Sequence, residues 1–150
     1  MANSQAICTS FKVEALNGIH ALGTTVARGG TTADTFKAAL YLASGSYGAS
    51  STAYSATSEV SGSGYSAGGV TFTWSAPASS GTTAYTTPSA SISYGTVTLS
   101  TSFDAVMLYN STQSDKAVGI YTFGATTVTA GTFTLTMPTN DSSTGLLRLA

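Results

Sequence analysis

Apolar residues near the start of the chain recur at helical spacing. Intervals of three, four, four and three residues separate five of them: Cys8, Phe11, Ala15, Ile19 and Leu22. This spacing is typical of one helix face and predicts an amphipathic helix over about residues 4–17, with Asn3 or Ser4 as its N-cap. Asn17-Gly18 is the expected exit, since glycine tolerates the left-handed conformation of a C-terminal cap. The Gly/Thr-rich stretch 23–33 that follows is predicted to be a loop.

From Asp34 onward the hydrophobic period changes to two, which predicts strands with one dry face. The first strand carries one alternating apolar set, namely Phe36, Ala38, Leu40 and Leu42. The residues expected on its other face are Lys37, Ala39 and Tyr41. Further strands are predicted over 70–74, 84–94, 95–99, 132–137 and 146–149. In the 132–137 strand Phe133, Leu135 and Met137 are expected to be buried together, so that Phe133→Ala costs about 3 to 5 kcal/mol.

One segment is apolar on both faces. Residues 105–109 have this pattern, which is typical of a central strand covered on both sides. A turn is predicted over 110–116 and a hairpin partner over 117–123. Short strands separated by Gly/Ser/Thr turns predict a mainly β, single-domain antiparallel β-sandwich, Ig-like or jelly-roll-like. We therefore expect one domain over 1–150, with a short N-terminal α-helix and the sandwich over about 34–150.

The stretch 44–69 is almost wholly Gly, Ser, Ala, Tyr and Thr, and Glu59 is its one charged residue. Tyrosine offers contact area at low entropy cost and Gly/Ser offer conformability, which is the composition of binding loops. Tyr47, Tyr54, Glu59 and Tyr65 are therefore the candidate partner contacts. The alternative is a long connection whose tyrosines cover the sandwich edge.

Charge and residue chemistry remove several classes of function. The chain has 5 Lys+Arg and 6 Asp+Glu, for a net charge of −1, so it lacks the basic cluster that nucleic acid or an anionic membrane requires. One cysteine and one histidine cannot form an internal disulfide or a usual zinc site. No apolar run approaches the roughly 20 residues of a membrane span. We expect no nucleic acid, membrane, metal or cofactor.

Catalytic chemistry is also poorly supplied. His20 is the one imidazole and follows the predicted helix, where a hydrogen-bonded structural role is the usual one. Cys8 falls on the apolar helix face and is expected to be a buried, inert thiol. Asp34 and Asp104 are expected to open strands, and acids in turns, such as Asp141, are explained by turn hydrogen bonds. We therefore expect no catalytic residue and no enzyme activity.

Several segments together resemble small β-rich virion proteins of tailed bacteriophages, across nearly the whole chain. They are Thr9-Ser10-Phe11-Lys12, Gly18-Ile19-His20, Asp34 to Tyr41, Glu59 to Tyr65, Tyr109-Asn110-Ser111 and Leu146 to Ala150. The resemblance to head decoration or cement proteins implies a structural role on the capsid surface, with the major capsid protein as partner. It also implies synthesis in the host bacterial cytoplasm. No catalytic motif accompanies it.

The composition is compatible with assembly. Cores of permanent interfaces are depleted of Lys, Glu and Asp and enriched in aromatics, and this chain has 15 Trp, Tyr and Phe residues. A homo-oligomer on the capsid is expected, with the N-terminal helix either a lid in cis or an arm exchanged with a neighbour. The alternatives are a phage tail, adaptor or receptor-binding protein and a carbohydrate-binding β-sandwich module. That module would stack sugars on Tyr47, Tyr54, Tyr65 or Trp74.

Overall fold

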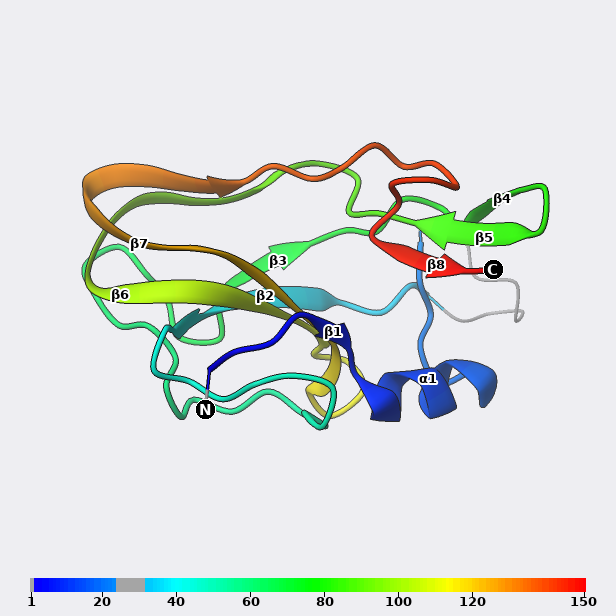
Figure 1. Ribbon diagram of the computed structural model, residues 1–150, viewed down its shortest axis with the longest axis horizontal. Coiled ribbons are helices and arrows are strands. Elements are labelled where there is room, and N and C mark those ends of the chain that lie inside the picture. The colour runs from blue at the N-terminus through cyan, green and yellow to red at the C-terminus, as the bar shows by residue number, and fades with distance from the viewer. Residues whose placement is uncertain (1, 24–31) are drawn as a thin grey trace.

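Alternating apolar residues place nearly half of the described residues in antiparallel strands, as the sequence predicts. The computed structural model describes residues 2–23 and 32–150, so residues 24–31 of the predicted loop lie outside the described residues. The elements are β1 (Ala6–Ile7), α1 (Thr9–Leu16), β2 (Phe36–Leu42), β3 (Val70–Phe72), β4 (Ala78–Ser80), β5 (Thr83–Thr86), β6 (Ile92–Asn110), β7 (Lys116–Leu135) and β8 (Leu147–Leu149). They form the predicted fold class, an antiparallel β-sandwich with a short helix near the N-terminus (Figure 1).

The larger sheet has the strand order β1-β7-β6-β2-β3, and β2 lies inside it. The predicted buried face of β2 is confirmed for Phe36, Ala38 and Leu40. Its other face was predicted to be open, but Ala39 and Tyr41 are also fully buried. The reason is that the loop after β2 folds back over this face, so β2 is covered on both sides.

β6 and β7 form the predicted hairpin, and β6 is buried on both faces from Ala105 to Asn110. The separate strands predicted over 95–99 and 105–109 are parts of the single strand β6. Asp104 was expected to open a strand and instead lies within β6, where it accepts a hydrogen bond from Asn3 Nδ2 at 2.6 Å. Register shifts between Ser93 and Tyr109 bend the hairpin, and Figure 1 shows it turning over the sheet.

The folded-over half of the hairpin packs its inner face on the sheet below. Tyr94 Oη donates a hydrogen bond to the Ala38 carbonyl on β2 at 3.2 Å. The Phe133 ring lies 5.0 Å from that of Phe103 and 5.8 Å from that of Tyr94. Phe133, Leu135 and Met137 were predicted to be buried together, but they are only half-buried against the core. They lie near the end of β7 and beyond it, where one side of the strand is open.

The N-terminal helix is shorter than predicted. Residues 4–8 are not helical, because Ala6–Ile7 forms β1 and pairs with β7. The N-cap is Cys8 rather than Asn3 or Ser4, while the exit at Asn17 and Gly18 is confirmed by a Gly18 φ of 65°. The predicted apolar stripe is buried at Cys8 and Phe11 but not at Ala15, which is exposed, and the second buried residue of α1 is Glu14.

The helix packs on its own chain, with the Phe11 ring 4.8 Å from the His20 ring. Two large apolar side chains of α1 face solvent, Val13 at 57% and Leu16 at 89% exposed. An eight-residue helix makes little more than two turns. Because so few residues contact the core, one buried polar interaction can determine which face of the helix is turned inward. Glu14 supplies that interaction, as described below.

The 44–69 segment is an ordered cover rather than a free loop. Isolated bridges join Tyr41 to Glu59 and Ser63 to Thr98, which attach it to β2 and β6. Its backbone approaches the sheet closely at Gly69, where φ is +72° and an added Cβ would lie 1.7 Å from the Ala38 carbonyl oxygen. Only glycine fits such an approach. Its position agrees with the alternative interpretation of this segment, in which it is a long connection that covers the sandwich.

The smaller sheet has the order β4-β5-β8 and lies at one end of the molecule beside α1 (Figure 1). The predicted strand over 146–149 is confirmed as β8, which forms an edge of this sheet. Leu147 is buried, whereas Arg148 and Leu149 are exposed. The space between β8 and α1 is the groove discussed next.

Candidate functional site

An apolar groove lies between α1 and the smaller sheet. It has a volume of about 520 Å³ and receives side chains from β1, α1, β5 and β8. Leu16 and Leu149, exposed at 89% and 71%, are among its lining residues. Large apolar side chains with this exposure on one concave surface are a mark of a binding site.

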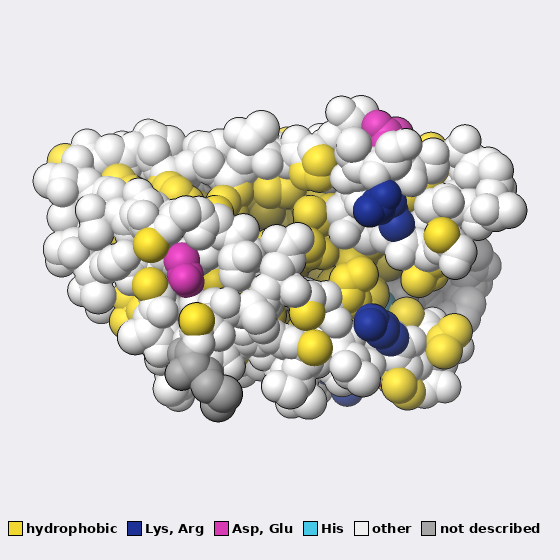
Figure 2. Space-filling view, in the orientation of Figure 1, with side chains coloured by type: hydrophobic (Ala, Val, Ile, Leu, Met, Phe, Trp, Pro, Cys, Tyr) yellow, Lys and Arg dark blue, Asp and Glu magenta, His cyan; other side chains and the backbone are white. Residues whose placement is uncertain are grey.

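Two cations flank the groove. Lys12 lies on the α1 side and Arg148 on the β8 side. Figure 2 shows basic side chains on both sides of a hollow with an apolar floor. No Asp or Glu lines the groove, and neither cation makes an ion pair within residues 2–23 and 32–150. The groove is therefore apolar inside and positive at its edges.

A second apolar hollow continues from the first. It has a volume of about 250 Å³ and lies between the β6–β7 hairpin and the chain before β8. Leu146 lines this hollow, while its neighbour Leu147 lines the larger groove. Near the N-terminus, Gln5 lines the smaller hollow and Ile7, two residues later, lines the larger groove. The apolar floor is therefore elongated, as Figure 2 shows.

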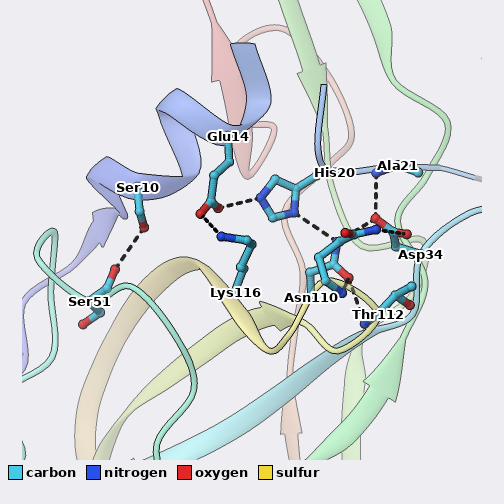
Figure 3. Close-up of polar contacts among 10 residues, drawn as sticks. Ser10, Glu14, His20, Ala21, Asp34, Ser51, Asn110, Thr112 and Lys116 are labelled. Atoms are coloured by element: carbon cyan, nitrogen blue, oxygen red, sulfur yellow. Dashed lines mark hydrogen bonds and ion pairs between the residues drawn. The ribbon is translucent and has the colours of Figure 1, made fainter. Parts of the chain in front are cut away.

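A buried polar cluster lies under the other side of α1 (Figure 3). Glu14 Oε1 accepts a hydrogen bond from Lys116 Nζ at 2.6 Å, and Glu14 Oε2 lies 2.9 Å from His20 Nε2. The His20 side chain is 1% exposed. On its far side His20 Nδ1 lies 3.0 Å from Asn110 Nδ2, which also donates to Asp34 Oδ2 at 2.7 Å.

The cluster fixes the tautomer of His20. The backbone N–H groups of Thr112 and Gln113 donate to Asn110 Oδ1 at 3.1 and 3.2 Å, so the Asn110 amide must present its NH₂ group to the ring. His20 Nδ1 therefore accepts, and Nε2–H donates to Glu14. Both ring nitrogens are occupied within the protein, so His20 has no lone pair available to a substrate.

The acids of this cluster are held as anions. Partial burial raises the pKa of Glu14, but hydrogen bonds from Lys116 and His20 outweigh it, so the pKa lies below its usual value. Burial likewise acts against Asp34, whose pKa is nonetheless lowered by hydrogen bonds from the Ala21 N–H, Asn110 and Gln113. The cluster joins α1, the segment after it and the β6–β7 hairpin. Its geometry suits a structural clamp.

Cys8 is fully buried, as predicted, although it lies at the N-cap rather than on the helix face. Burial, with a contribution from Glu14, raises the pKa of its thiol to about 11. A thiol in this state holds its proton at neutral pH and is a poor nucleophile.

Three of the four candidate contacts predicted in 44–69 form a second polar cluster. Glu59 Oε2 accepts from Tyr54 Oη at 2.6 Å, and Oε1 accepts from Tyr65 Oη and the Gly68 N–H, each at 2.7 Å. Burial, together with the hydrogen bond to Glu59, raises the pKa of Tyr54 to about 12. Tyr47 lies apart from Glu59 and donates to the Thr57 carbonyl at 2.5 Å.

The structure thus brings three of the four predicted contacts together, with Glu59 as the common acceptor. All four are half-buried, so part of each surface stays accessible, and their role as partner contacts stays a prediction. Trp74, the other candidate for sugar stacking, is 1% exposed and packs between Phe36 and Phe72. It presents no ring face to a sugar.

Comparison with protein family models, with curated proteins and with solved structures finds no match to this chain. Within residues 2–23 and 32–150, no group of three or more His, Cys, Asp and Glu side chains could hold a metal ion. No helix of the described part of the chain is long and apolar enough to cross a membrane. Function is therefore inferred from the geometry of the groove and the two clusters.

The groove is the feature that the sequence did not reveal. Its walls come from three distant segments, residues 7–22, 77–86 and 147–149, and no local pattern connects them. Leu16 lies outside the helical apolar pattern, but so does Val13, which does not line the groove, so this feature of the sequence does not by itself identify the site.

Proposed function

We propose that the protein is a structural virion protein of a tailed bacteriophage, a capsid decoration or cement protein that binds the major capsid protein lattice. The observation that carries a binding role is the open apolar groove with Leu16 and Leu149 exposed on it. The virion assignment rests on the resemblance of the segments named above. A cement protein stabilises a lattice because it binds the assembled state more tightly than separated subunits.

The side-chain chemistry supports binding over catalysis. His20 and Cys8, the usual bases and nucleophiles, are occupied or buried and protonated. The Glu14 and Asp34 carboxylates are committed to hydrogen bonds that hold the fold. What remains at the surface is apolar area, hydroxyl groups and a few cations such as Lys12 and Arg148, and the apolar and hydroxyl area suits a contact that persists at moderate salt.

The test uses phage particles from the genome that encodes the chain. Particles that lack the protein should release DNA at a lower temperature than complete ones, and adding the purified protein should restore the release temperature. Identical release temperatures with and without it would contradict the cement role. Cryo-electron microscopy of the same particles separates the alternatives, because density at the tail alone would replace the capsid role with a tail or adaptor role.

A further inference from the structure

We infer that the groove between α1 and β8 binds an extended segment of a partner protein that carries apolar side chains and at least one carboxylate. This inference rests on the proposed function, in which the protein binds a partner in an assembly. It adds which surface makes the contact and which partner chemistry that surface selects. Its three supports are the charge around the groove, the open edge of β8 and the shape of the apolar floor.

The charge pattern selects an acidic partner. Lys12 on α1 and Arg148 on β8 both line the groove, and no Asp or Glu is among its lining residues in the described part of the chain. Asp141 is the acid whose charge reaches Arg148, and its own carboxylate is committed to the Ser143 and Thr144 N–H groups and the Thr144 hydroxyl. A carboxylate seated between the cations therefore gains a complementary site.

The same charges oppose a second copy that docks by its own groove. In a symmetric pair the groove of one protomer faces the groove of the other, which would bring two copies each of Lys12 and Arg148 together. Like charges in an interface act against association. The occupant is therefore a segment of different chemistry.

The backbone geometry favours an extended segment. β8 forms an edge of the sheet β4-β5-β8, and its residues line the groove. An edge strand presents unpaired N–H and C=O groups to which an extended peptide can add, while pockets beside it receive alternate side chains. The elongated floor, which continues into the hollow lined by Leu146, gives such a chain apolar contacts along its length.

The direct test measures binding of two short fluorescein-labelled peptides by fluorescence anisotropy. One alternates leucine with aspartate, and the other has lysine in place of each aspartate. The wild-type protein should bind the aspartate peptide more tightly by about tenfold, and added salt should reduce this difference. Equal affinity for the two peptides, or no binding of either, would overturn the inference.

Matched variants locate the site. Leu16→Ser and Leu149→Ser should weaken binding of the aspartate peptide, whereas Val13→Ser, an exposed apolar position of α1 that does not line the groove, should not. Lys12→Gln should weaken it by several-fold, and Lys37→Gln should leave it unchanged. All these positions except Lys37 are exposed, so thermal melting of the variants at the exposed positions is expected to match the wild type. Equal effects of Leu16→Ser and Val13→Ser would contradict the assigned surface.

Binding of the wild type and the variants to phage particles distinguishes failure of this inference from failure of the proposed function. If Leu16→Ser and Lys12→Gln bind particles as tightly as the wild type, the groove assignment is wrong and the cement role stands. If the wild type binds the aspartate peptide but no particle, the capsid role is wrong and the groove chemistry stands. If the groove variants lose particle binding while the wild type and the control variants keep it, both the groove assignment and the cement role are supported.

Discussion

Replacing Glu59 should remove the main polar support of the 44–69 cover. Its carboxylate accepts three hydrogen bonds, from Tyr54, Tyr65 and the Gly68 N–H, at 2.6 to 2.7 Å. A hydrogen bond to a charged group contributes about 1.5 to 3 kcal/mol, and a half-buried donor left without an acceptor adds a desolvation cost. Because bonds that share one acceptor are not additive, we expect Glu59→Ala to cost about 3 to 5 kcal/mol.

A conservative change separates the charge from the shape. In Glu59→Gln the amide oxygen can keep the bonds from Tyr65 and the Gly68 N–H, and the NH₂ group can donate to the Tyr54 hydroxyl, but the negative charge that strengthens all three bonds is lost. The expected cost is about 1.5 to 3 kcal/mol. Asp115→Asn is the matched control, since Asp115 is an exposed acid in the β6–β7 turn and asparagine tolerates its φ of 57°. We expect it to change stability by less than about 0.5 kcal/mol.

The assay is urea unfolding followed by circular dichroism, with free energies from linear extrapolation. A double-mutant cycle of Glu59→Gln with Tyr65→Phe should show a coupling energy of about 1 kcal/mol or more, because the two side chains share one hydrogen bond. Additive losses would show that Glu59 and Tyr65 do not interact in solution. If Glu59→Gln costs no more than Asp115→Asn, the cover is held by packing alone.

Further predictions follow from the core, the thiol and the acids. Phe133→Ala should cost about 2 kcal/mol in a urea melt, below the range for a fully buried ring, and exposed Thr134→Ala less than about 0.5 kcal/mol. Equal losses of stability in the two variants would show that the inward and outward faces of this strand are assigned wrongly. Alkylation of Cys8, followed by mass spectrometry, should be slow until the protein unfolds, and rapid labelling of the native protein would contradict its burial. Stability should fall as the pH drops below about 4.5, since the pKa values of Glu14 and Asp34, ordinarily 4.5 and 3.8, are lowered by folding and unfolding then takes up protons. Glu14→Gln should reduce this loss, and an unchanged acid dependence would assign it to other groups.

The strands could be predicted because their signal is local. Period-two alternation gave β2, β3 and the β6–β7 hairpin, and two-sided apolarity identified the central part of β6. Alternation does not show where a strand bends, so β6 was divided into shorter strands. Its register shifts depend on the partner β7, which no local window contains.

The helix and the polar clusters depend on partners distant in sequence. The 4–17 prediction failed at its start because pairing of Ala6–Ile7 with Gly119 and Ile120 outweighs helix formation in this short segment. Glu14 is buried because it meets Lys116, which lies 102 residues away in the sequence. The same holds for Asn110 and His20, 90 residues apart. Hydrophobic period carries no information about such pairs.

The net charge of −1 is a poor guide to the partner of this protein, because its acids and bases are used differently. Five of the six acids accept hydrogen bonds at their side-chain oxygens within the described residues, namely Glu14, Asp34, Glu59, Asp104 and Asp141. Lys12 and Arg148 instead lie exposed beside apolar surface. Fields near a surface are set by the closest charges, since those beyond about 10 Å are screened at 0.1 M salt. A partner that approaches the groove therefore meets a positive, apolar surface on a chain whose total charge is slightly negative, and that local field selects a carboxylate.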